Sequence, residues 1–505
     1  MTAPEGASPR ATSRHRLALR VVAASAVLAL ASLWGTTHST PSLPVPGQHP
    51  PTARAAVRPN IVFVLTDDMS MNLLPYLPHV RAMQRHGTTL SHYYVVDSLC
   101  CPSRTAIFTG EYPHDNGVFT NSGRDGGYAA YQSHGDQLRS YAVALQDAGY
   151  RTGFMGKYLN GYDASDPVPP GWDSWAGVGL GYREYDYDMN VDGVVEHYGA
   201  EPQDYLTDVL SHRAGDFIDR AASAGKPFML QVSTFAPHAP YVPPVRYAES
   251  FPGLTYPRTP AYDRTPDNAL PWLSSRTPLA PSDPGRIDRI FRKRVQAGRA
   301  VDDLVAHIES VLKARGVADN TYLVFSSDNG YHMGDYRLMP GKQTAFDTDV
   351  HVPLVVVGPG VASGHVANQL GSNIDLAPTF EALAGATTPS TVDGVSLVPL
   401  LHGRAPARWQ RAVLIEHHQP GGRAYDPDRQ TPKSGMPPTY EAVRTSNAVY
   451  VRYSDGEQEY YDTTRDPYEL HNLAPYGVPP LLVVQLNALR ACHGAAQCPM
   501  AGRIG

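Results

Sequence analysis

Four oxygen-bearing side chains follow two apolar runs of the sequence. Asp67 and Asp68 come just after the run 60–65, and Asp328 and Asn329 come just after the run 322–325. In an open α/β sheet the carboxyl ends of neighbouring strands meet at one edge, so these side chains can converge although they lie far apart in the chain. Oxygen-only donors favour Ca²⁺ or Mg²⁺ over Zn²⁺. Each pair taken alone is better explained as a turn, because Asp and Asn are common in turns.

A second chemical candidate is the segment 100–110, Cys-Cys-Pro-Ser-Arg-Thr-Ala-Ile-Phe-Thr-Gly. It predicts a turn that opens into a helix, whose N-terminus offers backbone N–H groups and a positive dipole end to a tetrahedral anion. Arg104 adds a permanent charge. Burial as an inert hydrophobic residue is the commoner fate of a lone cysteine. A vicinal disulfide or a metal-binding Cys100–Cys101 pair is a further alternative, although no matching Cys–His set lies nearby in the sequence.

This segment resembles the signature of the sulfatase family, C-x-P-S-R followed by threonine and glycine, and matches it throughout. In that family the first cysteine is oxidised after translation to formylglycine (3-oxoalanine). The register assigns this change to Cys100 and leaves Cys101 at the variable position. The resemblance implies a formylglycine-generating enzyme as a maturation partner. It also implies a hydrated aldehyde in which one oxygen binds the metal and attacks sulfur, while the other later expels sulfate.

The resemblance implies roles for further residues. The metal is expected to be Ca²⁺, although the donor set admits Mg²⁺. Its ligands are expected to be Asp67, Asp68, Asp328, Asn329 and the modified Cys100. The family's sulfate-binding and proton-transfer positions fall on Lys157, His238 and Lys342, which act with Arg104. His238 or Lys342 is expected to protonate the leaving alcohol. Without the family, both lysines read as surface residues and His238 as a loop histidine.

The sequence around Lys157 resembles one branch of the family. Residues 156–160, Gly-Lys-Tyr-Leu-Asn, are similar to the N-acetylglucosamine-6-sulfatases and endosulfatases. Many sulfatases carry a histidine where this chain has Leu159, so the resemblance assigns no base for sulfate release. Asn160 and His332 are expected to contact substrate, with a turn or capping role as the alternative for each. The other blocks that resemble this branch are residues 100–104, 291–294, 301–304, 327–332 and 373–376, and the whole resemblance spans about 59–401.

The elements that must position these residues are an alternation of strands and helices. The runs 60–65, 228–232 and 322–325 predict buried parallel strands, and residues 137–148, 205–222 and 287–315 predict amphipathic helices. Residues 237–284 predict a long irregular insertion. Short alternating runs at 412–415, 441–444, 448–453 and 459–461 predict an antiparallel sheet. We therefore expect an alkaline-phosphatase-like α/β fold, in which helices flank a mostly parallel central sheet. The catalytic domain is expected at 59–404. A smaller α+β subdomain, built on the antiparallel sheet, is expected at 405–505.

The first 58 residues predict export. Basic residues before the apolar run 21–34 are typical of a signal peptide over residues 1–35, with an uncleaved membrane anchor as the alternative. Residues 36–58, rich in Pro, Ser and Thr, predict a flexible tether. Outside the cell, Cys492 and Cys498 could close a local disulfide. The net charge of -6 is spread along the chain, which argues against nucleic acid as a partner.

These observations predict a secreted or cell-envelope sulfuric ester hydrolase that acts on a sulfated carbohydrate, such as N-acetylglucosamine-6-sulfate, or on another sulfate ester. Two alternatives stay open. A phosphate or phosphonate ester hydrolase could use the same metal and nucleophile, because phosphate and sulfate share tetrahedral geometry. A non-catalytic protein could bind sulfated glycans on the same scaffold, with Cys100 left as a thiol.

Overall fold

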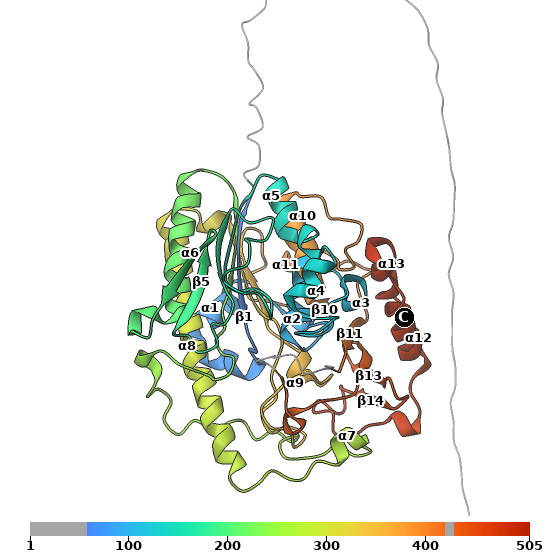
Figure 1. Ribbon diagram of the computed structural model, residues 1–505. Coiled ribbons are helices and arrows are strands. Elements are labelled where there is room, and N and C mark those ends of the chain that lie inside the picture. The colour runs from blue at the N-terminus through green and yellow to red at the C-terminus, as the bar shows by residue number, and fades with distance from the viewer. Residues whose placement is uncertain (1–57, 420–428) are drawn as a thin grey trace, which may run out of the picture. The chain divides into compact units, whose positions relative to one another are not determined.

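A computed structural model describes residues 58–419 and 429–505 (Figure 1). The predicted signal peptide or anchor lies outside the described residues, and so does the predicted tether except for Arg58. Within the described ranges, no helix is long and apolar enough to cross a membrane.

The main sheet has ten strands in the order β10-β2-β9-β8-β1-β7-β3-β4-β5-β6. Strand β1 lies between β7 and β8 and runs parallel to both. It is buried on both faces, and its residues 61–65 are apolar, as is typical of a central parallel strand. The three strands predicted from the apolar runs are therefore confirmed. The strands of this sheet are β1 (Asn60–Thr66), β2 (Thr88–Tyr94), β3 (Arg151–Lys157), β4 (Ser174–Val178), β5 (Tyr187–Val191), β6 (Val194–Tyr198), β7 (Phe228–Ser233), β8 (Thr321–Ser327), β9 (Leu354–Val357) and β10 (His365–Ser372).

Helices cover both faces of this sheet (Figure 1). On one face α1 (Pro78–His86), α6 (Leu206–Ser223) and α8 (Asp283–Ala314) share an apolar core with β1 and β7. The other face is covered by α2 (Cys100–Thr109), α4 (Gly127–Ser133), α5 (Tyr141–Asp147) and α10 (Leu376–Ala384). The short helices are α3 (Pro113–Asn116), α7 (Pro271–Ser274), α9 (Asp347–Val350) and α11 (Val398–Leu401).

One predicted helix is only partly correct. The range 137–148 begins with a short 3-10 helix, Asp136–Leu138, and the α-helix α5 starts only at Tyr141. Ser140 has extended backbone angles and separates the two elements. An unbroken amphipathic helix over 137–148 would place Leu138 on the same face as Tyr141 and Leu145, but this break turns it outward and it is 64% exposed. The predicted helices at 205–222 and 287–315 are confirmed as α6 and α8.

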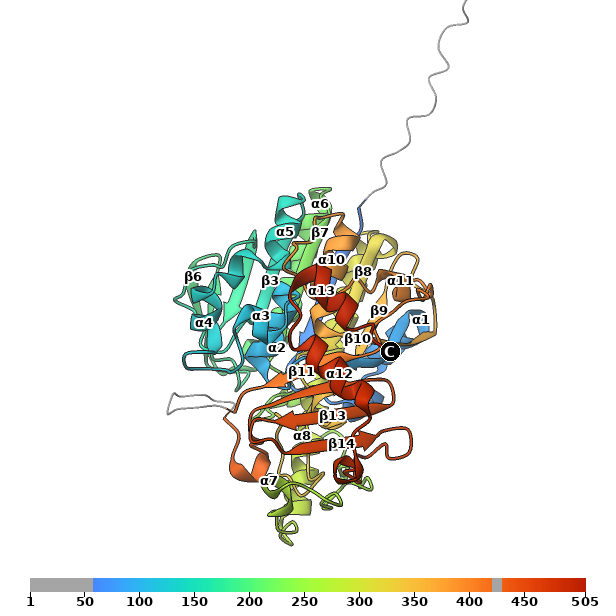
Figure 2. The same cartoon turned by 90° about the vertical axis from the view of Figure 1, so that its right-hand side faces the viewer.

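The C-terminal region forms a separate antiparallel sheet, β11-β12-β13-β14, as predicted (Figure 2). Its strands are β11 (Val413–His417), β12 (Tyr440–Arg444), β13 (Ala448–Tyr453) and β14 (Gln458–Asp462), and its helices are α12 (Pro480–Leu489) and α13 (Gly494–Ala501). The Cys492–Cys498 disulfide joins the segment between these helices to α13. The two sheets confirm the predicted fold class, whereas the domain boundary near residue 404 stays a prediction.

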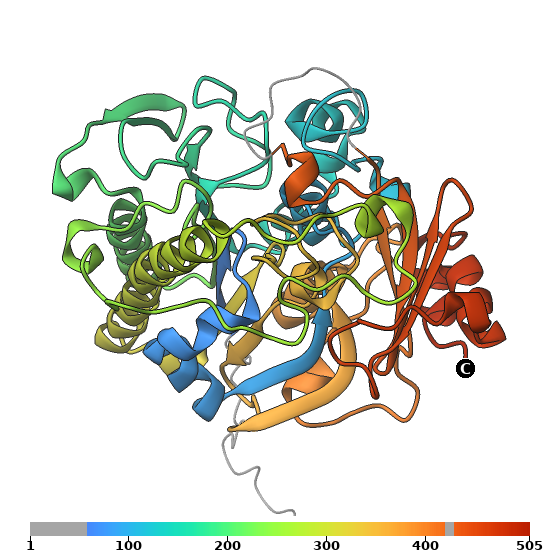
Figure 3. The same ribbon diagram turned by 90° about the horizontal axis from the view of Figure 1, so that it is seen from below.

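Residues 237–282 form the irregular insertion that the sequence predicts, with only two short helical turns. In Figure 3 this segment passes between α8 on one side of the molecule and the C-terminal sheet on the other. It is bonded to the C-terminal region, since the backbone N–H of Asp267 donates to Leu470 O at 2.7 Å. The insertion therefore follows β7 and is bonded to the segment that comes after β14.

Candidate active site

The ends of β1 and β8 bring the predicted oxygen donors together. Thr66 pairs with Ser327 at the last register position, so the residues that follow are neighbours. The N–H of Asp68 donates to Asp328 Oδ1 at 3.1 Å, and Asn329 Nδ2 donates to Asp68 Oδ1 at 2.6 Å. Asp68 has a positive φ of 64°, a conformation that costs energy for a residue with a Cβ and often occurs at functional sites. These contacts, together with the adjoining strands, hold the turn at Asp68 in this conformation.

Cys100 lies at the N-terminus of α2, as the sequence predicts, and is fully buried. Its Sγ lies 3.3 Å from Asp67 Oδ1 and 2.8 Å from Lys342 Nζ. Lys342 Nζ also donates to Asp68 Oδ1 at 2.7 Å. The sulfur atom therefore occupies a position between the carboxylate group that follows β1 and a buried ammonium group.

The remaining predicted cations surround the same carboxylates. Lys157, the last residue of β3, donates from Nζ to Asp67 Oδ2 at 2.6 Å. Arg104, one turn into α2, donates from Nε to Asp328 Oδ2 at 2.8 Å and from Nη1 to the carbonyl of Lys157 at 2.8 Å. Gly156 enables this position of Lys157, because a Cβ there would lie 1.9 Å from Ser233 O on the adjacent strand.

His238 lies on the other side of the carboxylate group. Its Nε2 is 3.6 Å from Asp68 Oδ2, and its Nδ1 lies 2.7 Å from Ala239 O. Since a carbonyl can only accept, Nδ1 carries a proton and Nε2 faces the site. Tyr182 packs against both His238 and Lys157, with its ring centroid 4.8 Å from each partner.

These charges shift the acidity of the carboxyl groups. Burial raises the pKa of Asp67, but Lys157, His238, Arg104 and Lys342 together outweigh it and hold that pKa below its ordinary value. Burial, followed by the nearby Asp67 carboxylate, raises the pKa of Asp328 to about 6. For Asp328, the nearby cations therefore offset only part of the pKa increase that burial and the Asp67 carboxylate cause.

The donor set fits a hard divalent cation. Ligand atoms of Asp67, Asp68, Cys100 and His238 all lie within 4.8 Å of one another. Asn329 Oδ1 is buried, and no described residue donates a hydrogen bond to it, so this oxygen could bind a cation. Three carboxylates and one amide oxygen are the donors that Ca²⁺ and Mg²⁺ prefer. Asp328 currently binds Arg104 and the N–H of Asp68, and its role as a ligand stays a prediction.

Comparison with known proteins identifies the family. Residues 59–386 match the sulfatase family, and residues 334–485 match the C-terminal region of N-sulphoglucosamine sulphohydrolase. The first match covers more than half of the chain. This chain belongs to the sulfatase family. The predicted resemblance is confirmed, and the predicted enzyme class is confirmed at the level of the family.

The chain is similar to two known sulfatases in sequence and to one solved structure in fold. This sulfatase is 34% identical over 473 residues to N-acetylglucosamine-6-sulfatase of Homo sapiens. The aligned region covers 86% of this chain and 85% of the relative. It is 37% identical to the extracellular sulfatase SULF-1 homolog of Drosophila melanogaster over 71% of this chain, but it spans only 33% of that relative's length. A solved structure in complex with its substrate D-glucosamine-2-N,6-O-disulfate has a TM-score of 0.71, at 22% identity over 83% of this sulfatase and 94% of that protein.

The two predicted substrate contacts lie outside the inner cluster. Asn160 is buried, and its Nδ2 lies 3.3 Å from the hydroxyl of Tyr182, so it borders the site through that ring. His332 is fully buried, with Nδ1 2.9 Å from both carboxylate oxygens of Asp349 and Nε2 2.7 Å from Ser434 O. Its backbone pairs with Gly341, next to Lys342. Both ring nitrogens of His332 therefore contact other parts of the protein, and its contact with substrate stays a prediction.

Sequence reasoning missed several residues that support the site. Arg294 of α8 is buried and donates from Nη2 to Asp68 O and, at 3.3 Å, to Ser70 Oγ. Asn121 Oδ1 accepts from the N–H of Cys101 at 2.9 Å. Arg294 lies in residues 291–294, which resemble the family branch, so this resemblance could have pointed to it. Tyr182 and Asn121 carry no such signal, because their positions depend on the folded loops.

Proposed function

We propose that this sulfatase hydrolyses the 6-sulfate ester of N-acetylglucosamine in a sulfated glycan, with a nucleophile formed from Cys100 and a divalent cation, Ca²⁺ in preference to Mg²⁺. The observation that carries the proposal is the position of Cys100 Sγ, buried between Asp67 and Lys342 at the edge of the oxygen-donor cluster. The choice of sugar rests on the relative named N-acetylglucosamine-6-sulfatase. The ligands we propose are Asp67, Asp68, Asp328, Asn329 and the modified Cys100.

Formylglycine at position 100 supplies a nucleophilic oxygen in place of sulfur, and a divalent cation supplies positive charge that polarises the ester. The protein supplies the remaining charge. Lys342 is buried against Cys100, and Lys157 and Arg104 are buried against Asp67, where the low dielectric strengthens their attraction for sulfate oxygens. These three groups stabilise the charge that develops on the sulfuryl group as its bond to the sugar breaks.

We assign the proton transfer to His238. Its Nδ1–H donates to Ala239 O, which fixes the ring and leaves Nε2 facing the site. A proton on Nε2 can pass to the departing sugar oxygen as the S–O bond breaks, so the alcohol leaves in neutral form. Lys342 is the second candidate for this proton transfer, because its ammonium group contacts Cys100 directly.

Mass spectrometry of the tryptic fragment 86–104 tests the nucleophile, in protein made together with its formylglycine-generating enzyme. We expect the mass loss that replaces the thiol by an aldehyde at Cys100. Rates of sulfate release from N-acetylglucosamine-6-sulfate and of phosphate release from the 6-phosphate then test the reaction, with Cys100→Ala as the control. An unmodified thiol in that host contradicts the mechanism, and faster phosphate release contradicts the reaction class.

We also propose that the protein is exported. The basic and apolar pattern of residues 1–35 supports this, as do the Cys492–Cys498 disulfide and a relative named as extracellular. N-terminal sequencing of the protein recovered from the medium or the cell envelope tests the proposal. Recovery of full-length chain from the cytoplasm alone would contradict it.

A further inference from the structure

A cavity of about 280 Å³ lies between the residues that follow β1, the insertion and the segment after β14. Its volume is close to the lower end of the range for cavities that hold small ligands. The described residues that line it include none of the proposed metal ligands or catalytic cations. From its lining we infer that this cavity binds a primary ammonium group on a short apolar chain. The inference concerns a second site and does not depend on the proposed function.

Three carboxyl groups line the cavity, whereas no lysine or arginine is among the described residues of its lining. Asp347 pairs with Arg444 of β12 through two hydrogen bonds of 3.0 Å, so its charge is balanced. Asp335 is buried and accepts a hydrogen bond from the neutral hydroxyl of Tyr256 at 2.6 Å. The imidazole of His351 stays neutral at pH 7, because burial lowers its pKa. The cavity therefore carries negative charge that its own lining does not balance.

Glu469 supplies the cavity with a buried acceptor. The residue is 1% exposed, and its Oε2 accepts from the N–H of Asp347 at 3.0 Å and from the hydroxyl of Tyr336 at 3.3 Å. No described residue donates a hydrogen bond to its Oε1. Burial, followed by the Asp347 carboxylate, raises the pKa of Glu469 well above its ordinary value. An ammonium group at Oε1 would satisfy this oxygen and would stabilise the charged carboxylate.

Much of the remaining lining is aromatic. Four tyrosines line the cavity: Tyr256, Tyr331, Tyr336 and Tyr468. Tyr336 is stacked on Phe346 with ring centroids 3.8 Å apart, which makes this part of the wall rigid. Tyr468 is 40% exposed, so the cavity opens to solvent beside it. The face of an aromatic ring attracts a cation and packs against methylene groups, so these rings suit an ammonium ion on an apolar chain.

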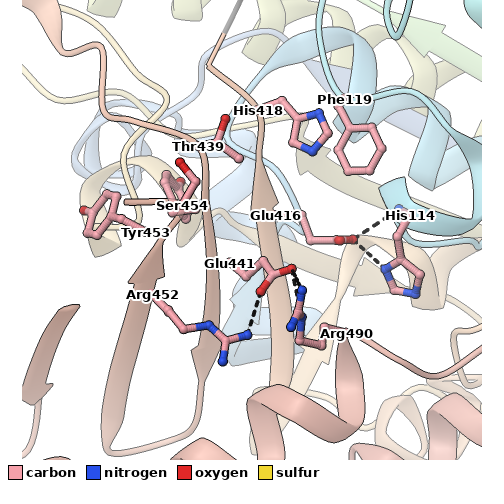
Figure 4. Close-up of a pocket in the computed structure, with 11 residues that line it drawn as sticks. His114, Phe119, Glu416, His418, Thr439, Glu441, Arg452, Tyr453, Ser454 and Arg490 are labelled. Carbon is pink, nitrogen blue, oxygen red and sulfur yellow. Dashed lines mark hydrogen bonds and ion pairs between the residues drawn. The ribbon is translucent and has the colours of Figure 1, made fainter. Parts of the chain in front are cut away.

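Other ligands match this cavity less well. A metal ion needs several donors around one point, and the described groups that could hold one do not include the three carboxyl groups of this cavity. An anion would be repelled by the same carboxyl groups. A second cavity, of about 490 Å³, differs in its charges, since its arginines Arg452 and Arg490 both pair with Glu441 (Figure 4). Those arginines already have a partner in the protein, so that lining gives no comparable indication of a ligand.

Calorimetric titration of the full-length protein tests the inference with two probes, n-pentylamine and pentan-1-ol, which differ only in the charged group. We expect the amine to bind at least about tenfold more tightly than the alcohol. Glu469→Gln should weaken binding of the amine about tenfold, because it removes a charge-assisted hydrogen bond. Glu459→Gln is the matched control, since Glu459 is also 1% exposed and accepts from a tyrosine hydroxyl, that of Tyr453, at 2.8 Å, but does not line the cavity.

A peptide with one lysine, acetyl-Gly-Lys-Gly-amide, distinguishes the two sources of such an ammonium group. Tighter binding of the peptide than of n-pentylamine would assign the cavity to a lysine side chain of another protein, and the reverse order would assign it to a free small amine. Either order supports the inference. Absence of binding for both the amine and the peptide would overturn it, and so would equal binding of the amine and the alcohol.

A second variant keeps the test decisive if Glu469→Gln does not fold. Tyr468→Ala changes an exposed residue at the opening and should weaken binding of the amine about threefold, through loss of one aromatic face. Unchanged binding of the amine in a variant that keeps its melting temperature would overturn the inference. Sulfate release is not part of this measurement, so failure of the proposed function gives a separate result.

Discussion

At the scale of single residues, each carboxylate of the site forms an ion pair with a buried lysine or arginine. Lys157 binds Asp67, Lys342 binds Asp68, and Arg104 binds Asp328. Pairing offsets the cost of burying these charges. A divalent cation bound to the same carboxylates would give the site a net positive charge, which would favour binding of an anionic ester.

The two adjacent cysteines differ in environment, and this difference predicts their roles. Cys101 is buried, and burial raises its pKa to about 12, so it stays a neutral thiol. We expect Cys100→Ala to abolish sulfate release, whereas Cys101→Ala should retain it and lower the free energy of unfolding by about 1 kcal/mol through loss of packing. Activity assays and urea unfolding of both variants measure this. Equal activity loss in the two variants would contradict the assignment.

Asn329 predicts the response of the protein to calcium. We expect Ca²⁺ to raise the melting temperature of the protein after chelation, because a cation that binds only the folded state stabilises it by about 2.7 kcal/mol at a hundredfold excess over Kd. Asn329→Ala should lose most of this effect, since it removes the open oxygen. Differential scanning fluorimetry with Ca²⁺ or Mg²⁺ measures the shift. An unchanged shift in Asn329→Ala would show that the cation binds elsewhere.

At the scale of elements, the long helix α8 supports the turn after β1. Its buried Arg294 donates to Asp68 O and lies over the ring of Tyr331, 4.2 Å from the ring centroid. An amphipathic pattern identifies α8 as a helix that packs on the sheet. That pattern does not show that Arg294, on the buried face of the helix, holds the turn at Asp68.

Substitution of Arg294 tests this support. We expect Arg294→Met to lower the free energy of unfolding by about 2 kcal/mol, because it removes hydrogen bonds from a charged group to buried acceptors. It should also lower kcat, since Asp68 would lose its fixed position. Lys293→Met, at the exposed neighbouring position, is the control. Wild-type kcat in Arg294→Met would show that the turn is held without it.

At the scale of the whole molecule, the C-terminal disulfide loop is bonded to the catalytic part of the chain through α3. His114 of α3 binds Glu416 through Nδ1 at 2.8 Å and Cys492 O through Nε2 at 2.9 Å. Asp393 Oδ1 accepts from the N–H of Gly494 at 2.6 Å. These bonds join parts of the chain that are hundreds of residues apart and therefore depend on the complete fold.

His114 makes this junction sensitive to pH. Burial lowers its pKa, but the bond to Glu416 and its charge raise the pKa to about 9, above the ordinary value of 6.5. The folded state holds the proton more tightly, so this stabilisation is complete below pH 6.5 and is lost as the pH rises to about 9, by at most about 3 kcal/mol. His114→Gln should remove this loss, as measured by urea unfolding from pH 6 to 9.5.

The exposed His197 supplies the control for this prediction, because His197→Gln should keep the wild-type pH dependence. Asp393 contributes in the same direction, since burial raises its pKa to about 8. Only the difference between wild type and His114→Gln therefore isolates the imidazole. The same slope in both proteins between pH 6.5 and 9 would contradict the role of His114.

The sequence by itself determined the family, the fold class and the residue types of the site. Local patterns carry this information: the apolar runs predict β1, β7 and β8, and the segment 100–110 fixes Cys100 at a helix N-terminus. The rule that ligands gather at the carboxyl ends of parallel strands predicted that Asp67 and Asp328 meet. The outward position of Leu138 was missed, because helical periodicity does not show where a helix breaks.

Only the tertiary structure decided which side chains contact one another. The pairing of Lys342 with Cys100, the support of Asp68 by Arg294 and the cavity between Ser70 and Glu469 each join segments separated by more than two hundred residues. No local pattern encodes such contacts, since they arise from the packing of the two sheets and the loops between them. The chemistry of the site is therefore readable in the sequence, whereas its geometry and the proposed ammonium site depend on the fold.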